Sequence, residues 1–144
     1  MKYAIRNRYD KTAIFSVEAE SFKGAIEAAL KRHISLAETD LSRVDLSGMN
    51  LSRIDLVRTD LSGANLSGAN LYGTNLSRSD LSNADLSHSN LYASDLSGAN
   101  LSHANVSDAD LSGSELVGAN LTDANFKGAD LLGAHIPQNL PLAA

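Results

Sequence analysis

The chain has 144 residues, of which 43% are hydrophobic and only 5% aromatic, with no tryptophan and no cysteine. This length suits one ordinary domain, and the lack of cysteine excludes disulfides and thiolate metal or redox sites. The net charge of −5 is uneven, because residues 1–33 carry a net +3 and residues 34–144 a net −8. An acidic chain is a poor candidate for direct nucleic-acid binding, since its field opposes every phosphate contact.

The amino terminus has no apolar stretch of the kind that signal peptides contain, and no apolar run approaches the length of a membrane span. We therefore expect a cytoplasmic protein that does not associate with membranes.

The first 33 residues predict a small unit of mixed structure. Apolar residues recur at every second position in two runs, Tyr3 and Ile5 and then Ala13, Phe15 and Val17. Asp10-Lys11-Thr12 lies between the runs, which is typical of a β-hairpin. Ser21 can cap a helix whose apolar residues then recur at helical spacing from Phe22 to His33. We interpret residues 1–33 as a hairpin–helix cap rather than an independent functional domain.

The pattern changes abruptly at Ile34 into a repeat of five residues. An apolar centre stands at every fifth position from Leu36 to Ile136, giving twenty-one units without a break in register. A small residue lies two places before most centres, and Asp or Asn directly precedes eighteen of them. Such strict self-similarity indicates a repeat architecture that spans residues 34–136.

A five-residue unit is too short for a helical hairpin or a propeller blade. It can form a short extended piece followed by a turn, as one side of a coil. Stacked coils would hydrogen-bond to one another at a spacing of about 4.8 Å. Because each unit turns a corner, only two of its five side chains can point inward, and the leucines would stack along the axis as a dry core.

The unit Ala64-Asn65-Leu66-Ser67-Gly68 resembles the tandem unit of pentapeptide-repeat proteins. The resemblance covers 103 of the 144 residues. It implies an all-β solenoid, a right-handed quadrilateral β-helix with four units per coil, in which the centre and the residue two places before it face inward. Twenty-one units then make about five coils and a rod of roughly 25 Å.

With four units per coil, residues twenty apart should lie above one another. We predict two of the inner core columns to be Leu36, Leu56, Leu76, Leu96 and Leu116, and Leu46, Leu66, Leu86, Val106 and Phe126. The larger residues at the inward small-residue site are Ile34, Val44, Met49 and Ile54, all at the start of the repeat. We therefore expect the amino-terminal helix to pack against the first coil and to cover its open end.

Three kinds of outward residue are candidates for contacts. Tyr72 and Tyr92 should stack, either to stabilise the sheet or as an aromatic contact patch. His88 over Asp108 and His103 over Asp123 are interpreted as surface ion pairs rather than a metal or catalytic site, because a convex wall cannot exclude water. The acidic column contains Asp40, Asp60 and Asp80; its aspartates either shape the corners of the coil or present an acidic surface.

The sequence contains no phosphate-binding glycine loop and no metal-ligand spacing, so we expect no catalytic, cofactor or metal site and no enzyme. The preferred interpretation is a bacterial or phage-derived scaffold that binds an unidentified protein through a regular acidic surface. The resemblance implies an alternative, since some members of that family mimic DNA and bind DNA gyrase or topoisomerase IV, both type II topoisomerases. A third hypothesis is an engineered or idealised repeat protein with no natural partner.

Residues 137–144 form a short tail with two prolines, which oppose continued strand pairing. The last coil would then be protected only by Ile136, Leu140 and Leu142. An apolar end of this kind favours a homodimer through the carboxy-terminal end.

Overall fold

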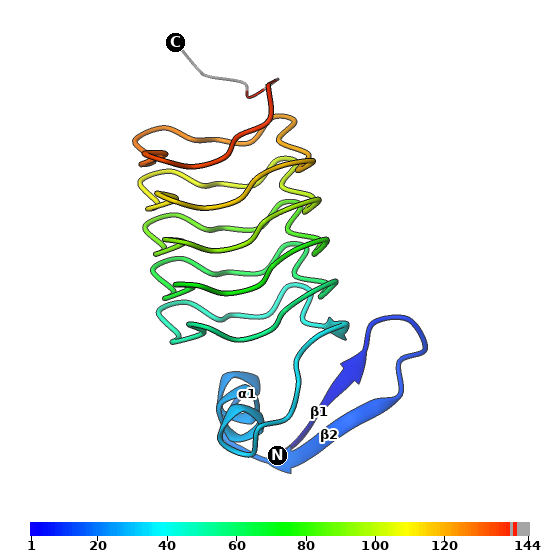
Figure 1. Cartoon of the computed structure of the whole chain (residues 1–144). Coiled ribbons are helices and arrows are strands. Elements are labelled where there is room, and N and C mark those ends of the chain that lie inside the picture. Colours follow the sequence, from blue (N-terminus) through cyan, green and yellow to red (C-terminus); the bar gives the residue numbers. More distant parts are fainter. Residues whose placement is uncertain (139, 141–144) are drawn as a thin grey trace.

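A computed structural model describes residues 1–138 and 140 of the chain. Strands β1 (Lys2–Asn7) and β2 (Ala13–Glu18) form an antiparallel hairpin, followed by helix α1 (Phe22–Lys31) and the short strand β3 (Thr39–Asp40). The strand order is β2-β1-β3, so β1 also pairs with the beginning of the repeat region. In Figure 1 these elements lie at one end of a stack of coils.

The hairpin and the helix begin and end close to where the sequence predicts them. Tyr3 pairs with Val17 and Ile5 with Phe15 across the hairpin, and the Ile5 side chain is fully buried. Helix α1 begins after Ser21, whose Oγ accepts a hydrogen bond from the backbone N–H of Gly24 at 3.0 Å. Such a cap satisfies one of the backbone donors that the first helical turn leaves unpaired. No helix among residues 1–138 and 140 is long and apolar enough to cross a membrane.

From β3 onward the backbone pairs with itself at a spacing of twenty residues. Parallel bridges form four ladders, one for each unit of a coil, and they begin at Asp40, Asp45, Asn50 and Asp55. The first ladder continues through Asp60, Asp80, Asn100 and Asn120. Each coil therefore has four sides, and the coils stack along one axis (Figure 1).

We name each side of the coil by the centre that it contributes to the second coil. The four sides are the Leu56, Leu61, Leu66 and Leu71 sides, in chain order, and each includes the residues twenty apart above and below. Because the chain closes a turn after four units, the Leu71 side adjoins the Leu56 side and lies opposite the Leu61 side.

Each corner is a tight turn that the sequence of the unit supports. In the unit around Leu61, the Ala64 N–H donates to the Leu61 carbonyl at 3.0 Å, and Gly63 has a φ of +66°. A positive φ at the third residue of such a turn marks a type II β-turn, where glycine is favoured. Sharp corners of this kind turn the residues after each centre outward.

The core consists of the apolar centres and the small residues two places before them. Among the predicted core columns, Leu36 through Leu116 and Leu46 through Val106 are buried. Phe126 is only partly buried, because residues 1–138 and 140 form no further coil above it. The inward hydroxyls are all paired; Ser79 Oγ, for example, donates to the Leu76 carbonyl at 2.6 Å. The described residues contain no buried side-chain polar atom without a hydrogen-bond partner.

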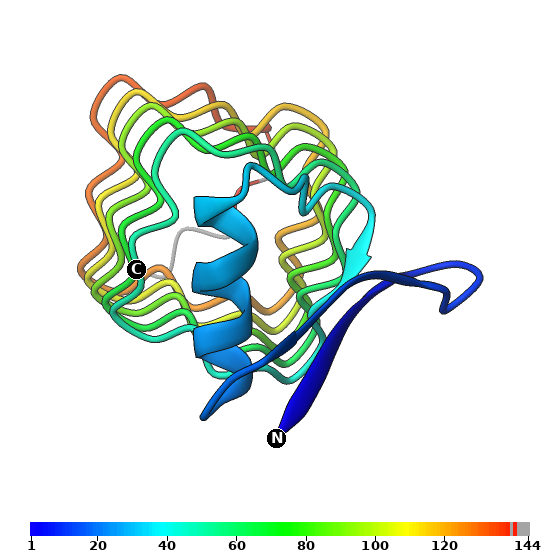
Figure 2. The ribbon, with the colours of Figure 1, turned by 90° about the horizontal axis from the view of Figure 1, so that it is seen from below.

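Helix α1 lies across the open mouth of the first coil, as the view along the axis shows (Figure 2). Its Ile26 and Ala29 side chains are fully buried in the same cluster as the leucines of the coils, and Ile34, Val44 and Ile54 pack against that cluster. The Lys23 ammonium donates to the Ser47 carbonyl. The bulky inward residues at the start of the repeat thus meet the helix, which shields the end of the core from water.

Candidate functional surfaces

The Asp or Asn directly before most centres stabilises the corner of the coil through its side chain. The Oδ1 atom of Asp60 accepts the Ser62 N–H at 3.0 Å and the Ser62 hydroxyl at 2.7 Å. Asn65 and Ser67 make the same two bonds. Only one side-chain oxygen is needed to accept the backbone N–H of the residue two places later, so either Asp or Asn can occupy this position.

The acidic column runs along the Leu61 side through Asp40, Asp60 and Asp80, with Asn100 and Asn120 above them. Asp40 also forms an ion pair with Lys11 of the hairpin loop at 2.9 Å. Partial burial raises the pKa of Asp40, but hydrogen bonds from Ser42 and Lys11 outweigh it and leave this pKa below its ordinary value. The Oδ1 atoms of Asp60 and Asp80 are engaged at the corner, and the carboxylates are only partly buried.

Tyr72 and Tyr92 stack on the Leu71 side, with ring centroids 5.7 Å apart and planes 3° from parallel. The Arg53 guanidinium lies 5.2 Å from the Tyr72 ring centre, which extends the column by a cation–π contact. The stacking expected from the twenty-residue spacing is therefore present. Tyr92 remains 45% exposed, so the stack also presents an aromatic surface to solvent.

Three of the four histidines pair with carboxylates one coil away. His88 Nε2 lies 3.9 Å from Asp108, His103 Nδ1 lies 3.7 Å from Asp123, and His135 Nδ1 lies 2.6 Å from Glu115. All of these side chains are at least 43% exposed, where ion pairs contribute little to stability. Among the described residues, no group of three or more His, Cys, Asp or Glu side chains could hold a metal ion.

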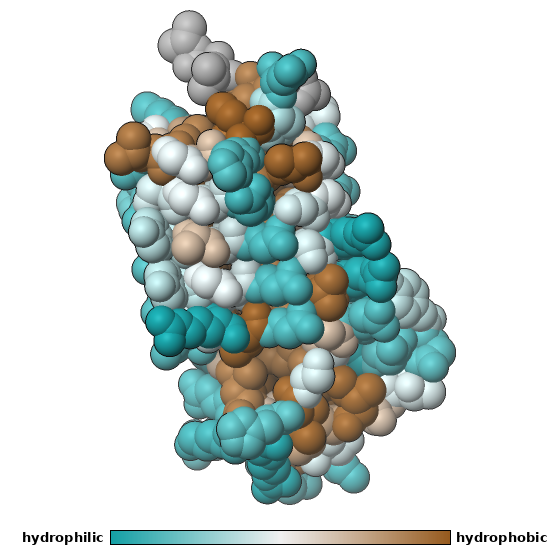
Figure 3. Space-filling view, viewed as in Figure 1, coloured by the Kyte–Doolittle hydropathy of each residue, from teal (hydrophilic) through white to brown (hydrophobic). Residues whose placement is uncertain are grey.

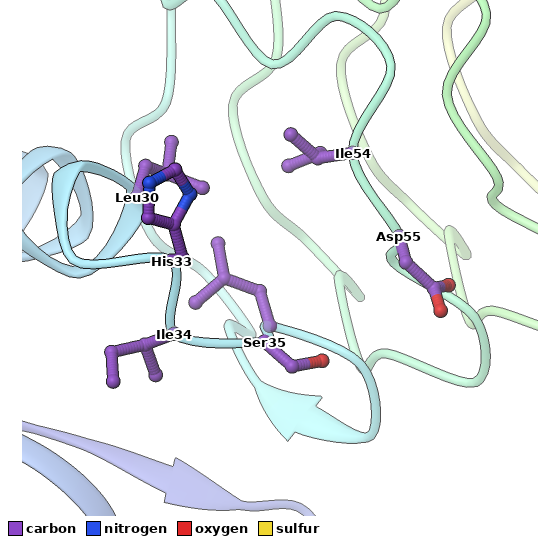
Figure 4. Close-up of a pocket in the computed structure, with 7 residues that line it drawn as sticks. Leu30, His33, Ile34, Ser35, Ile54 and Asp55 are labelled. Atoms are coloured by element: carbon purple, nitrogen blue, oxygen red, sulfur yellow. The ribbon is translucent and has the colours of Figure 1, made fainter.

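A pocket of about 260 Å³ lies between the end of α1 and the first coils (Figure 4). Leu30, Ile34 and Ile54 supply apolar walls, whereas the Asp55 carboxylate lies on the far side from His33. Because its polar groups do not converge on one point, the pocket offers apolar contact and no evident catalytic arrangement. Sequence analysis missed this pocket, since it depends on how the helix meets the coil.

The carboxy-terminal end of the core is partly exposed. Ile136 is 41% exposed, while Leu140 packs against the core cluster. The outward side chain of Leu132, in the last coil, is 80% exposed. Leu142 lies outside the described residues. The space-filling view shows apolar patches on the upper coils and where the cap meets the coils (Figure 3).

Comparison with protein families identifies the repeat. The chain matches the family of pentapeptide repeats over residues 39–78, 79–116 and 107–136, with eight copies. The chain belongs to the pentapeptide-repeat family. A comparison with curated proteins gave no match.

Several solved structures from this family are similar to the chain. A pentapeptide repeat protein from the thylakoid lumen of Arabidopsis thaliana is 38% identical, with a TM-score of 0.55, and the match covers 72% of this chain and 68% of that protein. Rfr23 from the cyanobacterium Cyanothece 51142 is 25% identical, with the same TM-score of 0.55, and the match covers 78% of this chain and 100% of Rfr23. QnrB1, a plasmid-mediated fluoroquinolone resistance protein, is 26% identical over 69% of this chain and 58% of its own, with a TM-score of 0.38.

Proposed function

We propose that the protein is a non-enzymatic scaffold in the cytoplasm that binds a protein partner through the outer surface of its coils. Its coils wind in the right-handed sense that family membership implies. The main support is the filled interior, since the leucine columns and the paired hydroxyls leave the solvent-facing positions to carry function. Those positions can vary without disturbing the core, which suits a surface for recognition.

Photo-crosslinking from each side of one coil tests this function. A photoreactive amino acid is placed at Ser77, Ser82, Ser87 or Tyr92, which face outward from the four sides of the same coil. In the source cells, we expect a discrete crosslinked protein from one side or from two adjoining sides. Equal or absent crosslinking from all four positions would contradict the scaffold function.

A second candidate function is protection or inhibition of a type II topoisomerase by mimicry of DNA. The observation that favours it is the column of Asp40, Asp60 and Asp80, whose carboxylates lie one coil apart, at the strand spacing of about 4.8 Å. DNA gyrase supercoiling is measured with the protein titrated in at two salt concentrations. Mimicry predicts inhibition that weakens with salt, because screening reduces the field of the carboxylates.

The matched variant for this assay carries Asp60→Asn and Asp80→Asn together. Asparagine occupies the same position in other units and keeps the corner hydrogen bonds, so only the charge changes. Under mimicry this variant inhibits less than the original protein. No inhibition at micromolar protein, or equal inhibition by both proteins, would set this candidate aside.

We also propose that two copies associate through their carboxy-terminal ends. The exposure of Leu132 and Ile136 supports a contact between apolar side chains. Sedimentation measured over a range of protein concentrations should show a dimer that Leu132→Ser and Ile136→Ser together disrupt. A monomer at every concentration would contradict this association.

A further inference from the structure

The residue directly after each apolar centre separates the four sides of the coil into two kinds. On the Leu61 and Leu66 sides this position holds serine in every unit except Thr122 and Lys127. On the adjoining Leu56 and Leu71 sides, large apolar or aromatic residues repeatedly replace serine: Val57, Tyr72, Tyr92, Val117 and Leu132. Larger side chains thus interrupt an otherwise uniform repeat along the edge where these two sides meet. We call the surface formed by these five residues the Val–Tyr edge.

The geometry of the corner does not require these replacements. The Val57 N–H still donates to Asp55 Oδ1 at 2.9 Å, and the Tyr72 N–H to Asn70 Oδ1 at 3.1 Å, as serine N–H groups do elsewhere. Valine and tyrosine lose the second bond that a serine hydroxyl makes to the same oxygen. Val117 is nevertheless 61% exposed and Leu132 is 80% exposed. The fold therefore gains little from Val117 and Leu132 in the isolated chain, which points to contact with another molecule.

A shallow groove of about 480 Å³ follows this edge on the Leu56 side. Val57 and Val117 lie among its lining residues three coils apart, with Ser77 and Ser97 between them. Three coil spacings amount to about 14 Å, which is the length of roughly four residues of extended chain. The groove can therefore take a short extended segment whose apolar side chains meet a valine at each end.

The charged side chains that line the groove are both basic, although the protein as a whole is acidic. Arg58 and Arg78 line it, and Arg53 lies on the adjoining Leu71 side. Arg58 is paired with Glu38 at 3.5 Å, whereas within residues 1–138 and 140 the Arg78 guanidinium has no ion-pair partner. On the Leu56 side, the Oδ1 atoms of Asp55 and Asp95 accept hydrogen bonds from Val57 and Ser97, and Glu115 bonds His135. A carboxylate from outside is the complement that Arg78 lacks.

We propose that the Val–Tyr edge binds an extended segment of a partner protein in which apolar residues flank a carboxylate. The apolar side chains contact Val57 and Val117, and the carboxylate pairs with Arg78. Tyr72 and Tyr92 extend the contact onto the Leu71 side, and tyrosine and arginine are the residue types that protein interfaces favour. This inference rests on the proposed scaffold function and names the surface and the chemistry of its partner.

Selection from a library of random peptides displayed on phage tests the inference. Peptides retained by the unmodified protein are sequenced, synthesised with a fluorophore and titrated by fluorescence anisotropy. We expect retained peptides in which an Asp or Glu lies between apolar residues. Their affinity should fall by about tenfold or more in Arg78→Gly and in Val117→Ser.

Arg43→Gly is the matched control for Arg78→Gly. Both arginines occupy the same turn position with a positive φ, and the next coil has glycine above each of them, Gly63 and Gly98. Val117→Ser likewise introduces the residue found one coil below, Ser97, so all three variants should fold. We expect the control to bind the peptides as well as the unmodified protein does.

Other outcomes overturn the inference. It fails if no peptide is retained, if the retained peptides are basic, or if Arg43→Gly and Arg78→Gly weaken binding equally. Peptides that depend on Arg43 alone would move the site to the Leu61 side and leave the scaffold function standing. The scaffold function itself fails only in the crosslinking experiment, so the two failures are distinguishable.

Discussion

At the third position of the turn, single residues adopt a backbone conformation that glycine tolerates best. Gly48, Gly63 and Gly68 have a φ near +65°, but Arg78 and Ala93 adopt a φ of +57° at the equivalent position. A side chain in this left-handed region is strained by contact between its Cβ and the backbone. The fold tolerates this backbone strain at several turns, where the side chain points outward into solvent.

Exchanging glycine and alanine at this position should change stability in opposite directions. Gly68→Ala should lower the free energy of unfolding by about 1 kcal/mol, because no atom lies within 4 Å of the added Cβ and only backbone strain opposes it. Ala93→Gly should raise it by about 0.5 kcal/mol, since relief of strain outweighs the extra freedom of the unfolded chain. Urea unfolding measures both changes, and a loss of stability in both variants would contradict this account.

The corner aspartates and asparagines act through one oxygen rather than through charge. Asp60→Ala removes the acceptor of two hydrogen bonds and should cost about 1 kcal/mol. Asp60→Asn keeps that oxygen and should change the free energy of unfolding by less than about 0.5 kcal/mol. Thermal and urea unfolding compare the two variants. Equal destabilisation would show that the negative charge, and not the corner, is what matters.

At the scale of the element, each coil is stabilised mainly by the coils on both sides of it. Leu76 is fully buried between neighbouring leucines of its column, whereas Leu131 is only partly buried near the end. In such stacked repeats, stability is approximately a sum over units and their nearest neighbours. A leucine in the middle of the rod therefore contributes more to stability than a leucine at its end.

Truncation of two leucines tests this dependence on position. Leu76→Ala should cost about 3 kcal/mol, because it leaves a cavity between two packed coils. Leu131→Ala should cost less than about half of that, since solvent already reaches its site. Hydrogen exchange measured alongside urea unfolding should show the second change confined to the last coil. Similar costs at both positions would mean that the rod unfolds as one unit with an equally tight end.

At the scale of the whole molecule, the cap and the coils are held together partly by charge. Lys11 in the hairpin loop pairs with Asp40 in the first coil, and Arg8 donates to the Arg58 carbonyl at 2.6 Å. A side-chain hydrogen bond from Ser47, with others, also lowers the pKa of Asp45. Both carboxyls are therefore more acidic in the folded protein than their ordinary value of 3.8.

Acid should weaken the molecule through these carboxyls. A lowered pKa in the folded state contributes stability that is present above the unfolded pKa and is lost as the pH falls through the folded one. The urea midpoint should therefore decline as the pH falls below about 4. Asp45→Asn keeps the corner acceptor and removes the titrating group, so its midpoint should decline less. An identical decline in both proteins would assign the acid sensitivity to other groups.

The sequence by itself determined the five-residue repeat and its leucine core, because a strict period of five leaves the chain few ways to bury its leucines. The four units per coil, the resulting twenty-residue stacking and the second inward position were expected from the resemblance to pentapeptide-repeat proteins. The sequence also predicted the hairpin and the helix from local pattern, whereas the stack of Tyr72 on Tyr92 was expected from the twenty-residue coil that the resemblance implies. The sequence also contains the difference between the sides, because Val57 and Val117 stand where other units have serine. This difference can be recognised only when the units are sorted by the side of the coil on which they lie. Tertiary structure alone decided how α1 crosses the first coil, the apolar pocket beside Ile54 and the pairing of β1 with β3. Those features depend on contacts between segments that do not share a repeat period, so no regular pattern in the sequence predicts them.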